Sequence, residues 1–391
     1  MKKLKIGLFI DTWYPMVDGV IMVVDNYAKR LSKFCDVTVF TVDTGVDTRE
    51  HPYKIVKTKS RQLFKLAYKI PYITKEFKKT LNEYDLDIVH IHSPFFVGKE
   101  GLKYAKERNI PVISTLHSQF KKDFKRSARL NFIVNILMKK VLKVFDACDE
   151  NYAVNNKISE IFYEYGLKRL PKVTRNGTDM LPVEDKEKAI ETVNKKYNID
   201  KGTPVFLFVG RITRLKNVYF ITEALAKLKN QDYKMFFVGE GNDAAEVERL
   251  AKKLGISDKV ILTGKIVDRE LLKAIYLRAK LFLFPSKYDA SSLVQIEAAS
   301  QGTPTVFLEG TATSATVTDN VNGFIAKDSL EDFVAKIEEV LENKELYNTV
   351  SKNASEQLYV TWDTCVQEMY KIYEYHIEEN KKKLKENKNS K

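Results

Sequence analysis

The chain has 391 residues, of which 44% are hydrophobic and 30% charged, and its formal net charge is +13. This length allows two domains of ordinary size, each with its own core. No apolar run reaches the roughly 18 residues that cross a bilayer, and the N-terminus lacks the features of a signal peptide. We therefore expect a cytoplasmic protein, attached at most to the inner face of a membrane.

The positive charge is concentrated in the first half of the chain. Residues 1–180 contain 33 lysines and arginines against 20 aspartates and glutamates, whereas residues 181–391 contain 32 of each. Such asymmetry indicates an anionic partner, either anionic lipid or nucleic acid. The three cysteines have no paired spacing, which excludes a disulfide framework and a recognisable zinc site.

The first half begins with a βαβ pattern. A strand is predicted over 4–10, a helix over 21–34 and a second strand over 36–41, and Gly19 closes the loop before the helix. The turn has no GxGxxG, which argues against a nicotinamide enzyme. Further strands are predicted over 88–91 and 112–116. His117 follows the last of these, at the carboxyl end of a strand, where ligands bind in such sheets.

Two stretches of the first half are basic and amphipathic, namely 53–81 and 120–145. Each mixes aromatic and aliphatic side chains with lysines, as helices that lie in the headgroup layer of a membrane do. Each could also be an ordinary helix with one face in the core and a solvated basic face. Together with the one-sided charge, the two stretches favour contact with an anionic membrane.

The second half is expected to form another strand and helix series after a linker near 178–200. Strands are predicted over 205–209, 234–238 and 260–262. The first ends in Gly210-Arg211, with Lys216 five positions on, and the second in Gly239-Glu240-Gly241. The glycines of the second turn are required more by its tightness than by chemistry.

The stretch 281–306 predicts a strand, loop, helix and strand in succession. An apolar run ends at Pro285, a polar loop follows, and a helical pattern starts near Leu293. A helix N-terminus at the end of such a strand attracts anions such as diphosphate. Asp289 in the loop and Glu297 in the helix could accept hydrogen bonds from sugar hydroxyls. Alternatively, Asp289 caps the helix and Glu297 is a solvated helix residue.

This stretch resembles the signature of glycosyltransferase family 4, in which two glutamates eight positions apart precede Glu-Ala and Gly-Thr-Pro. The sequence differs by Asp289 at the first glutamate and by Ser291-Ser292-Leu293 where the family has Phe-Gly-Leu. The resemblance extends along essentially the whole chain. It implies an α/β protein of the GT-B architecture, with two facing doubly wound Rossmann-like domains and the active site in the cleft between them.

The resemblance also implies the activity: retaining transfer of a sugar, glucose or a related hexose, from a nucleoside diphosphate donor, expected to be a UDP-sugar. The implied catalytic residues are Asp289, His117, Arg211 and Lys216. The implied donor-binding residues are Gly19, Arg211, Lys216, Gly239, Val267, Ser292, Leu293, Val294 and Glu297. No metal or other cofactor is expected, since two cations and a helix end supply the positive charge.

The implied domain plan is an acceptor-binding domain over 1–180, a nucleotide-sugar domain over 181–358, a returning helix over 359–380 and a disordered basic tail over 381–391. The expected acceptor is a lipid or lipid-linked glycan, with diacylglycerol as one candidate, at an anionic membrane surface. A soluble acceptor, as in polysaccharide or disaccharide synthesis, is the first alternative. A GT-B sugar-nucleotide epimerase is the second. No nucleic-acid motif accompanies the charge, so no nucleic-acid partner is expected.

Overall fold

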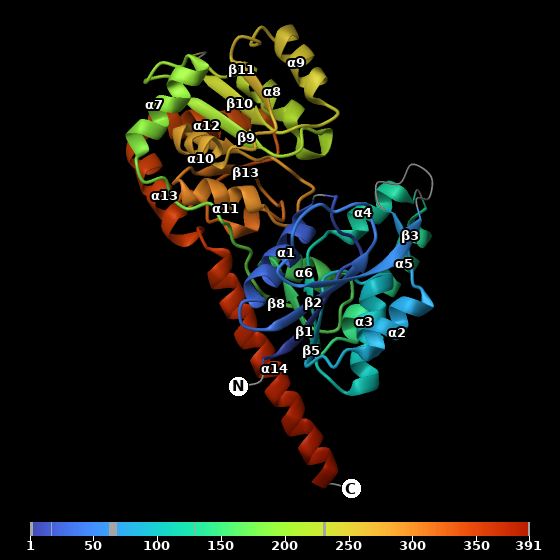
Figure 1. Ribbon diagram of the computed structural model, residues 1–391. Helices are drawn as coiled ribbons and strands as arrows, with labels where there is room; N and C mark the ends of the chain where they lie inside the picture. Colours follow the sequence, from blue (N-terminus) through green and yellow to red (C-terminus); the bar gives the residue numbers. More distant parts are fainter. Residues whose placement is uncertain (1–2, 17, 62–68, 129, 230–231, 390–391) are drawn as a thin grey trace. The chain divides into compact units, whose positions relative to one another are not determined.

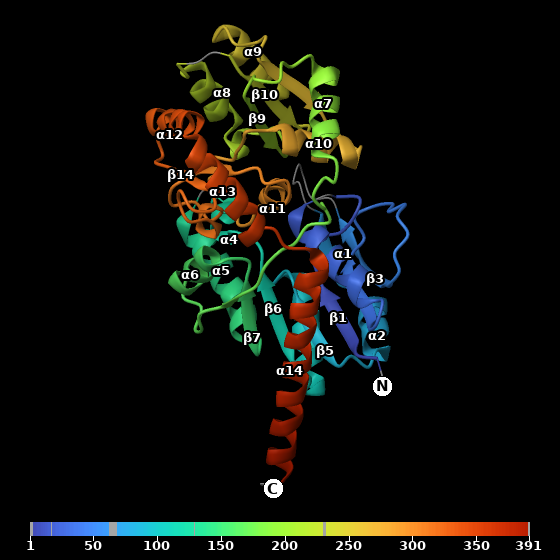
Figure 2. The ribbon, with the colours of Figure 1, turned by 90° about the vertical axis from the view of Figure 1, so that its left-hand side faces the viewer.

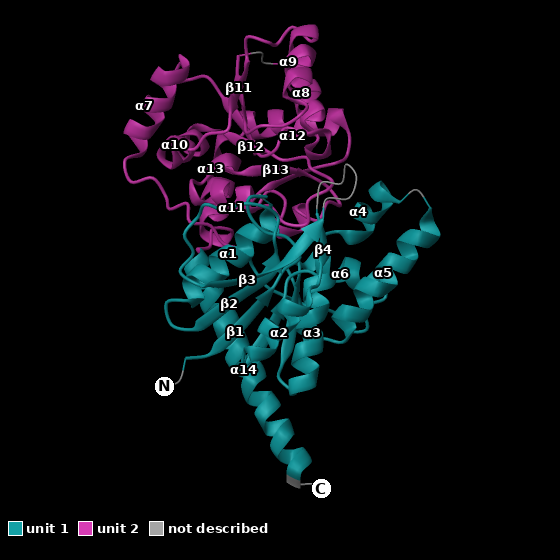
Figure 3. Ribbon diagram, turned by 45° about the vertical axis from the view of Figure 1, so that its right-hand side comes forward, with its two compact units in different colours: residues 1–176, 362–391 teal, residues 177–361 magenta. Residues whose placement is uncertain are grey.

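A computed structural model describes residues 3–16, 18–61, 69–128, 130–229 and 232–389. The chain forms two compact units (Figure 3). Unit 1 comprises residues 1–176 and 362–391, and unit 2 comprises residues 177–361. The first stretch of unit 1 runs to Asn176, and the C-terminal segment belongs to the same unit.

Unit 1 is built on a sheet that has eight strands within the described residues. All neighbouring pairs are parallel except β3 and β4. β1, β2, β5 and β6 are buried almost throughout, as strands covered on both faces are. In spatial order the strands are β4 (Ile70–Tyr72), β3 (Lys54–Arg61), β2 (Asp36–Val42), β1 (Lys5–Phe9), β5 (Ile88–Ile91), β6 (Val112–Leu116), β7 (Glu150–Ala153) and β8 (Lys172–Val173).

Helices cover both faces of this sheet (Figure 1). Phe77 and Tyr104, from α2 and α3, pack with β-strand residues such as Phe9 and Phe40 in one core cluster. Because side chains alternate along a strand, His90 points to the opposite face, where it meets Tyr373 of α14. The helices of unit 1 are α1 (Gly19–Leu31), α2 (Lys75–Glu83), α3 (Phe96–Arg108), α4 (Phe120–Ser127), α5 (Asn131–Asp146), α6 (Asn156–Glu164) and α14 (Trp362–Asn389).

Unit 2 is built on a wholly parallel sheet, six-stranded within the described residues. Its strands in spatial order are β11 (Val260–Gly264), β10 (Lys234–Val238), β9 (Val205–Val209), β12 (Leu281–Leu283), β13 (Thr305–Leu308) and β14 (Phe324–Ala326). Its helices are α7 (Lys186–Tyr197), α8 (Val218–Ala226), α9 (Ala244–Lys253), α10 (Arg269–Arg278), α11 (Leu293–Ser300), α12 (Leu330–Glu342) and α13 (Lys344–Gln357). Short 3-10 turns lie at η1 (Arg214–Lys216) and η2 (Ser314–Thr316).

Two expectations about local structure are wrong. The stretch 53–81 is not one amphipathic helix: it contains β3, β4 and the start of α2, while residues 62–68 lie outside the described residues. β3 pairs in register with β2, and this pairing overrides the helical pattern. The segment 178–200 is not a plain linker, because α7 begins at the Asp185 cap and buries Val193.

The C-terminal segment is helical as far as Asn389, so the disordered tail expected over 381–391 is a helix where the structure describes it. Figure 2 shows the first half of α14 lying against unit 1 and its second half projecting beyond it. Trp362, Met369 and Tyr373 are buried, whereas residues 381–388 are exposed. Alternating lysines and glutamates, including the Lys382–Glu379 ion pair, support the exposed turns.

Among the described residues, none of the helices combines the length and apolarity that crossing a bilayer requires. The cysteines at 35, 148 and 365 are free thiols buried in the fold, in keeping with packing roles.

Candidate active site

The strand order of unit 2 places a switch point beside β9. β9 pairs with β10 on one side and with β12 on the other. Ligands of doubly wound sheets bind in the crevice beyond the carboxyl ends of such strands. The loop after β9 carries Arg211 and Lys216, and the loop after β12 carries Asp289 and leads into α11. The fold therefore gathers most of the predicted donor-site residues at one end of two adjacent strands.

Lys216 and Asp289 form an ion pair between these two loops. Their side chains are 18% and 17% exposed, so water screens the pair only in part. The Lys216 ammonium has three donors, and two remain for a ligand when one contacts Asp289. Asp289 is not the cap of α11, and that alternative is wrong because Ser292 fills the position.

Arg211 lies two residues after the end of β9 and is exposed. Its guanidinium has no hydrogen bond or ion pair to another of the residues that the structure describes. A guanidinium without a protein counter-charge can donate two parallel hydrogen bonds to a phosphate. Arg211 is therefore available to an anionic ligand without breaking a contact of the folded chain.

The N-terminus of α11 lies at the same end of the sheet. Ser292 is its N-cap, and the Ser292 hydroxyl accepts a hydrogen bond from the Gln295 amide at 3.2 Å. The amides of Leu293 and Val294 have no carbonyl four residues earlier within the helix to bond. They add their partial positive charge to that of the two cations.

Glu297 lies one turn into α11 with only 12% of its side chain exposed, so it is not a solvated helix residue. Its Oε2 accepts a hydrogen bond from the Tyr276 hydroxyl at 3.0 Å, and Arg269 Nη1 lies 3.4 Å from Oε1. Burial raises the pKa of the Glu297 carboxyl, and Arg269 opposes the rise. Each oxygen has a second lone pair, so the carboxylate can still accept from ribose hydroxyls.

Glycines allow the turns after β9 and β10 to approach closely. A Cβ on Gly239 would lie 2.0 Å from the Gly210 carbonyl oxygen, and Gly239 has φ +136°. A Cβ on Gly241 would lie 2.0 Å from the Ile212 carbonyl oxygen. Backbone packing thus accounts for both glycines, and a direct contact of Gly239 with the donor stays a prediction.

Val267 lies in the loop after β11 and is 78% exposed. An aliphatic side chain in water at the ligand end of a sheet gains free energy when a flat ring covers it. The prediction that Val267 contacts the donor is compatible with this position, and it stays a prediction.

Gly19 and His117 belong to unit 1. Gly19 is the first residue of α1, after the Asp18 cap, and a Cβ there would meet no protein atom within 4 Å. His117 follows β6, is partly exposed and hydrogen-bonds His92 at 3.0 Å. Burial lowers the pKa of His117 to about 3, so its imidazole is neutral at physiological pH. The proposed contacts of both residues with the donor stay predictions.

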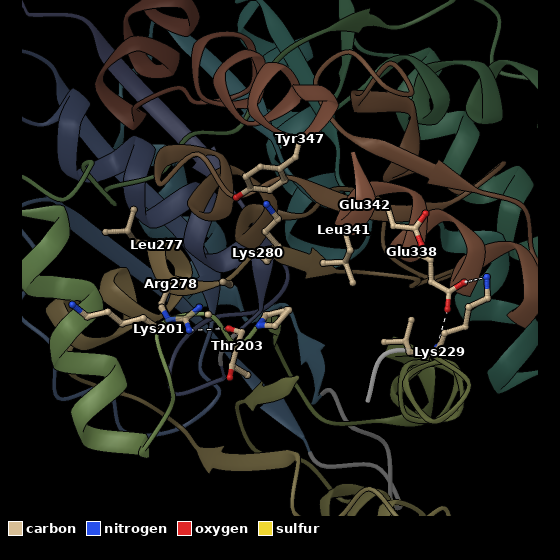
Figure 4. Close-up of a pocket in the computed structure, with 14 residues that line it drawn as sticks. Lys201, Thr203, Lys229, Leu277, Arg278, Lys280, Glu338, Leu341, Glu342 and Tyr347 are labelled. Atoms are coloured by element: carbon tan, nitrogen blue, oxygen red, sulfur yellow. Dashed lines mark hydrogen bonds and ion pairs between the residues drawn. The ribbon is translucent and has the colours of Figure 1, made fainter. Parts of the chain in front are cut away.

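A pocket of about 540 Å³ lies at the opposite end of the unit 2 sheet (Figure 4). Thr203 precedes β9 and Lys280 precedes β12, and both line it. Two of its cations are already engaged: Arg278 Nη2 donates to the Thr203 carbonyl at 2.8 Å, and Lys280 Nζ lies 3.1 Å from the centroid of the Tyr347 ring. None of the predicted donor residues lines this pocket, so it is not the candidate site.

The described residues contain no group of three histidine, cysteine, aspartate or glutamate side chains placed to hold a metal ion.

Two family models match the chain in succession. Residues 17–180 match "Glycosyltransferase Family 4", and residues 189–357 match "Glycosyl transferases group 1". Together the two matches span most of both units.

The chain belongs to glycosyltransferase family 4. This GT4 enzyme is therefore a retaining transferase that depends on a nucleoside diphosphate sugar. Membership of this family favours sugar transfer over the alternative of a sugar-nucleotide epimerase.

Curated relatives of the GT4 enzyme include two alpha-monoglucosyldiacylglycerol synthases. The Streptococcus pneumoniae protein is 28% identical over 315 residues, which cover 78% of this chain and 70% of that protein. The Acholeplasma laidlawii protein is 24% identical over 405 residues, which cover 97% and 99%.

Solved structures confirm the GT-B fold. Anabaena HepE in complex with UDP matches with a TM-score of 0.77 at 16% identity, covering 96% of this chain and 100% of that one. Sucrose-phosphate synthase from Thermosynechococcus elongatus matches with a TM-score of 0.76 at 20% identity, covering 95% and 99%.

Sequence reasoning missed three residues that support the site of the GT4 enzyme. Tyr276 and Arg269 lie on α10 and hold Glu297, but an aromatic and a basic residue in a helix carry no sequence signal for that role. The third is His92, whose Nδ1 lies 3.0 Å from Nε2 of His117. Its place two residues after His90, where β5 ends, was a usable signal.

Proposed function

We propose that the GT4 enzyme transfers glucose or a related hexose from a UDP-sugar to a lipid or lipid-linked glycan, at an anionic membrane surface on the cytoplasmic side. The donor half of the proposal rests on one observation. The ion-paired Lys216 and Asp289, the unpartnered Arg211 and the start of α11 share the switch point of the unit 2 sheet.

The donor diphosphate gains negative charge as its bond to the sugar breaks. Arg211, the two remaining Lys216 donors and the amides of Leu293 and Val294 would stabilise that charge. Because Asp289 holds Lys216 before the donor arrives, this cation needs little reorganisation during the reaction. Glu297 would hold the ribose hydroxyls through the lone pairs that Tyr276 and Arg269 leave open.

Asp289 would accept hydrogen bonds from hydroxyls of the transferred sugar, near the reacting carbon. Lys216 keeps this carboxylate in place through their ion pair. Ser292 would contribute by holding the start of α11, while Gly19 and His117 would contact the donor from unit 1. The resident UDP in the HepE structure supports the choice of base, at the level of the shared fold.

The donor site is tested with Arg211→Ala. We expect turnover to fall at least tenfold, about 1.4 kcal/mol of lost stabilisation, with an unchanged melting temperature. Arg211 is the sharper test than Lys216, because removing it breaks no contact among the described residues. Arg249→Ala is the matched control, since Arg249 is an exposed arginine paired with Glu246 on α9. Equal rates in the Arg211 variant and the parent would show that the diphosphate binds elsewhere.

The acceptor half rests on the two curated relatives named for diacylglycerol lipid synthesis and on α5. One face of α5 is buried, while Phe132 and Ile136 on the other are 61% and 48% exposed. Exposed lysines at 139, 140 and 143 continue that face toward the C-terminal end of the helix. Exposed apolar groups beside basic ones are the chemistry of a helix that lies in a headgroup layer.

Sedimentation with vesicles tests the acceptor half. Phosphatidylglycerol vesicles should bind the enzyme, phosphatidylcholine vesicles should not, and salt should weaken binding because each lysine contributes about 1 kcal/mol near an anionic surface. Phe132→Ser with Ile136→Ser should lower binding at least tenfold. Leu254→Ser, at an exposed leucine of unit 2, is the control. Equal binding to both vesicles, or none, would leave a soluble acceptor as the better assignment.

A further inference from the structure

Three histidines of unit 1 lie together at the carboxyl ends of β5 and β6, of which His90 and His92 are buried and His117 is partly exposed. His90 uses both ring nitrogens: Nδ1 contacts the Tyr373 hydroxyl at 2.7 Å and Nε2 contacts the Thr115 hydroxyl at 2.8 Å. His92 Nδ1 lies 3.0 Å from His117 Nε2, and the two rings are stacked with their planes 21° apart. In the His92–His117 pair, either ring could donate the hydrogen bond, and the surroundings of the two rings decide which one does.

Both imidazoles of the His92–His117 pair are neutral. Burial lowers the pKa of each well below its ordinary value. A neutral imidazole carries one proton, so one ring donates the shared hydrogen bond and the other accepts it. Two arrangements are therefore open. Either His92 donates, and His117 has its proton on Nδ1, or His117 donates, and His92 has its proton on Nε2.

The other nitrogen of His92 decides between the two arrangements. His92 Nε2 is buried and has no hydrogen-bond partner among the described residues. If His117 donated, the proton of His92 would sit on Nε2 as a buried N–H without an acceptor, which costs roughly 1–3 kcal/mol. If His92 donates from Nδ1, only a lone pair is left without a partner at Nε2. Unpartnered buried acceptors are more common in proteins than unpartnered buried N–H groups, so this arrangement is favoured.

The consequence reaches His117. With Nε2 accepting from His92, the single proton of His117 lies on Nδ1. No described residue is hydrogen-bonded to Nδ1, and the residue is partly exposed at the end of β6. The ring thus presents an uncharged N–H donor, which suits the oxygen of a sugar hydroxyl and does not add charge beside the reacting carbon.

We propose that His92 is a positioning residue that holds His117 as its Nδ1–H tautomer, so that His117 donates a hydrogen bond to a hydroxyl of the transferred sugar. The proposal rests on the proposed function for the role of His117 and goes beyond it in assigning His92 and the tautomer. His90, held by Thr115 and Tyr373, packs against His92 with ring centroids 4.0 Å apart and keeps that ring in place.

The tautomer is tested first, in the ligand-free protein. Long-range proton–nitrogen correlation spectra of the chain labelled with ¹⁵N-histidine distinguish Nδ1–H from Nε2–H in each of the five histidines. We expect His117 as Nδ1–H, assigned through the signal lost in His117→Gln. A His117 signal of the Nε2–H form would overturn the proposal, whatever the enzyme's activity.

The role in the reaction is tested with two substitutions of His92. Asn places an amide N–H near the position of Nδ1 and should keep the His117 tautomer and most of the turnover. Leu removes the donor, so His117 should change to Nε2–H and kcat should fall about tenfold while UDP affinity is unchanged. His376→Leu, at a buried histidine bonded to Tyr152, is the control for losing a histidine of unit 1.

The outcomes separate this proposal from the donor site. Turnover of His92→Leu equal to that of the parent, with the tautomer changed, would overturn the role of His92 and leave the Arg211 result intact. Equal loss of turnover in the Leu and Asn variants would also overturn this role. That pattern would indicate that His92 acts through packing and not as a hydrogen-bond donor. If His92→Leu fails to fold, the tautomer of the parent protein and the Asn variant still decide the question.

Discussion

At the residue scale, the buried carboxylate of Glu297 lowers the stability of the fold at neutral pH. It is buried, and its pKa is raised because burial disfavours the charged form more than Arg269 and Tyr276 favour it. A raised carboxyl pKa means that the folded state binds the proton more tightly than the unfolded chain. Stability therefore falls as pH rises through the unfolded and then the folded pKa, and the cost persists at neutral pH.

Glu297→Gln should therefore be at least as stable as the parent at pH 7.5, and its advantage should shrink toward pH 4, where both side chains are neutral. Donor affinity should fall roughly tenfold or more, because a hydrogen bond to a charged acceptor contributes about 1.5–3 kcal/mol. Urea unfolding at the two pH values and donor KM measure the two effects. A variant clearly less stable at pH 7.5 would show that the contact with Arg269 outweighs burial.

At the element scale, the candidate site depends on how closely the ends of β9 and β10 approach. The Gly239 amide donates to the Gly264 carbonyl at 2.9 Å, and the Gly210 amide donates to the Val238 carbonyl at 3.0 Å. These bonds hold the turns after three adjacent strands together at the ligand end of the sheet. Backbone atoms fill the space beside Gly239, so a side chain there has no flexible neighbour to displace.

Gly239→Ala should lower stability by roughly 1–3 kcal/mol, because alanine is strained at a positive φ and its Cβ would overlap a carbonyl oxygen. Donor affinity should fall with it, since Arg211 follows the displaced turn. Gly202→Ala is the control, because a Cβ at Gly202 meets no protein atom within 4 Å and its φ is not positive. Thermal unfolding measures the stability of both variants. Equal losses of stability would show that the close approach of the two turns is not the cause.

At the scale of the whole molecule, the C-terminal helix is part of unit 1 although it follows unit 2 in the chain. Arg30 of α1 lies 3.4 Å from Asp363, and Phe34 packs edge to face on Tyr370. Tyr373 reaches the interior and bonds His90. The buried half of α14 therefore closes one face of the unit 1 sheet.

Removal of residues 382–391 should leave stability within about 0.5 kcal/mol and turnover unchanged, because residues 382–388 are exposed. Tyr373→Phe should cost about 1–3 kcal/mol, since it leaves the His90 nitrogen buried without a partner. Thermal unfolding measures both. A large loss on truncation would mean that the exposed turns have a partner, and vesicle sedimentation of the truncated chain would then identify or exclude a membrane.

Sequence by itself determined the fold and the ligand end of each sheet. Apolar runs ending in Gly210-Arg211 and Pro285 indicated buried parallel strands, because the pattern of burial is local and repeats along the chain. The resemblance of the stretch around Glu297 then indicated the family and the donor residues, and the family matches confirmed the first of these.

Only the tertiary structure decided which side chains meet. The pairs Lys216–Asp289, Tyr276–Glu297 and His92–His117 join loops or helices that are 73, 21 and 25 residues apart. No local pattern encodes such a contact, because it depends on the order and register of the strands. The same holds for β3, whose helical sequence pattern yielded to pairing with β2, and for α14, whose place in unit 1 is set by burial.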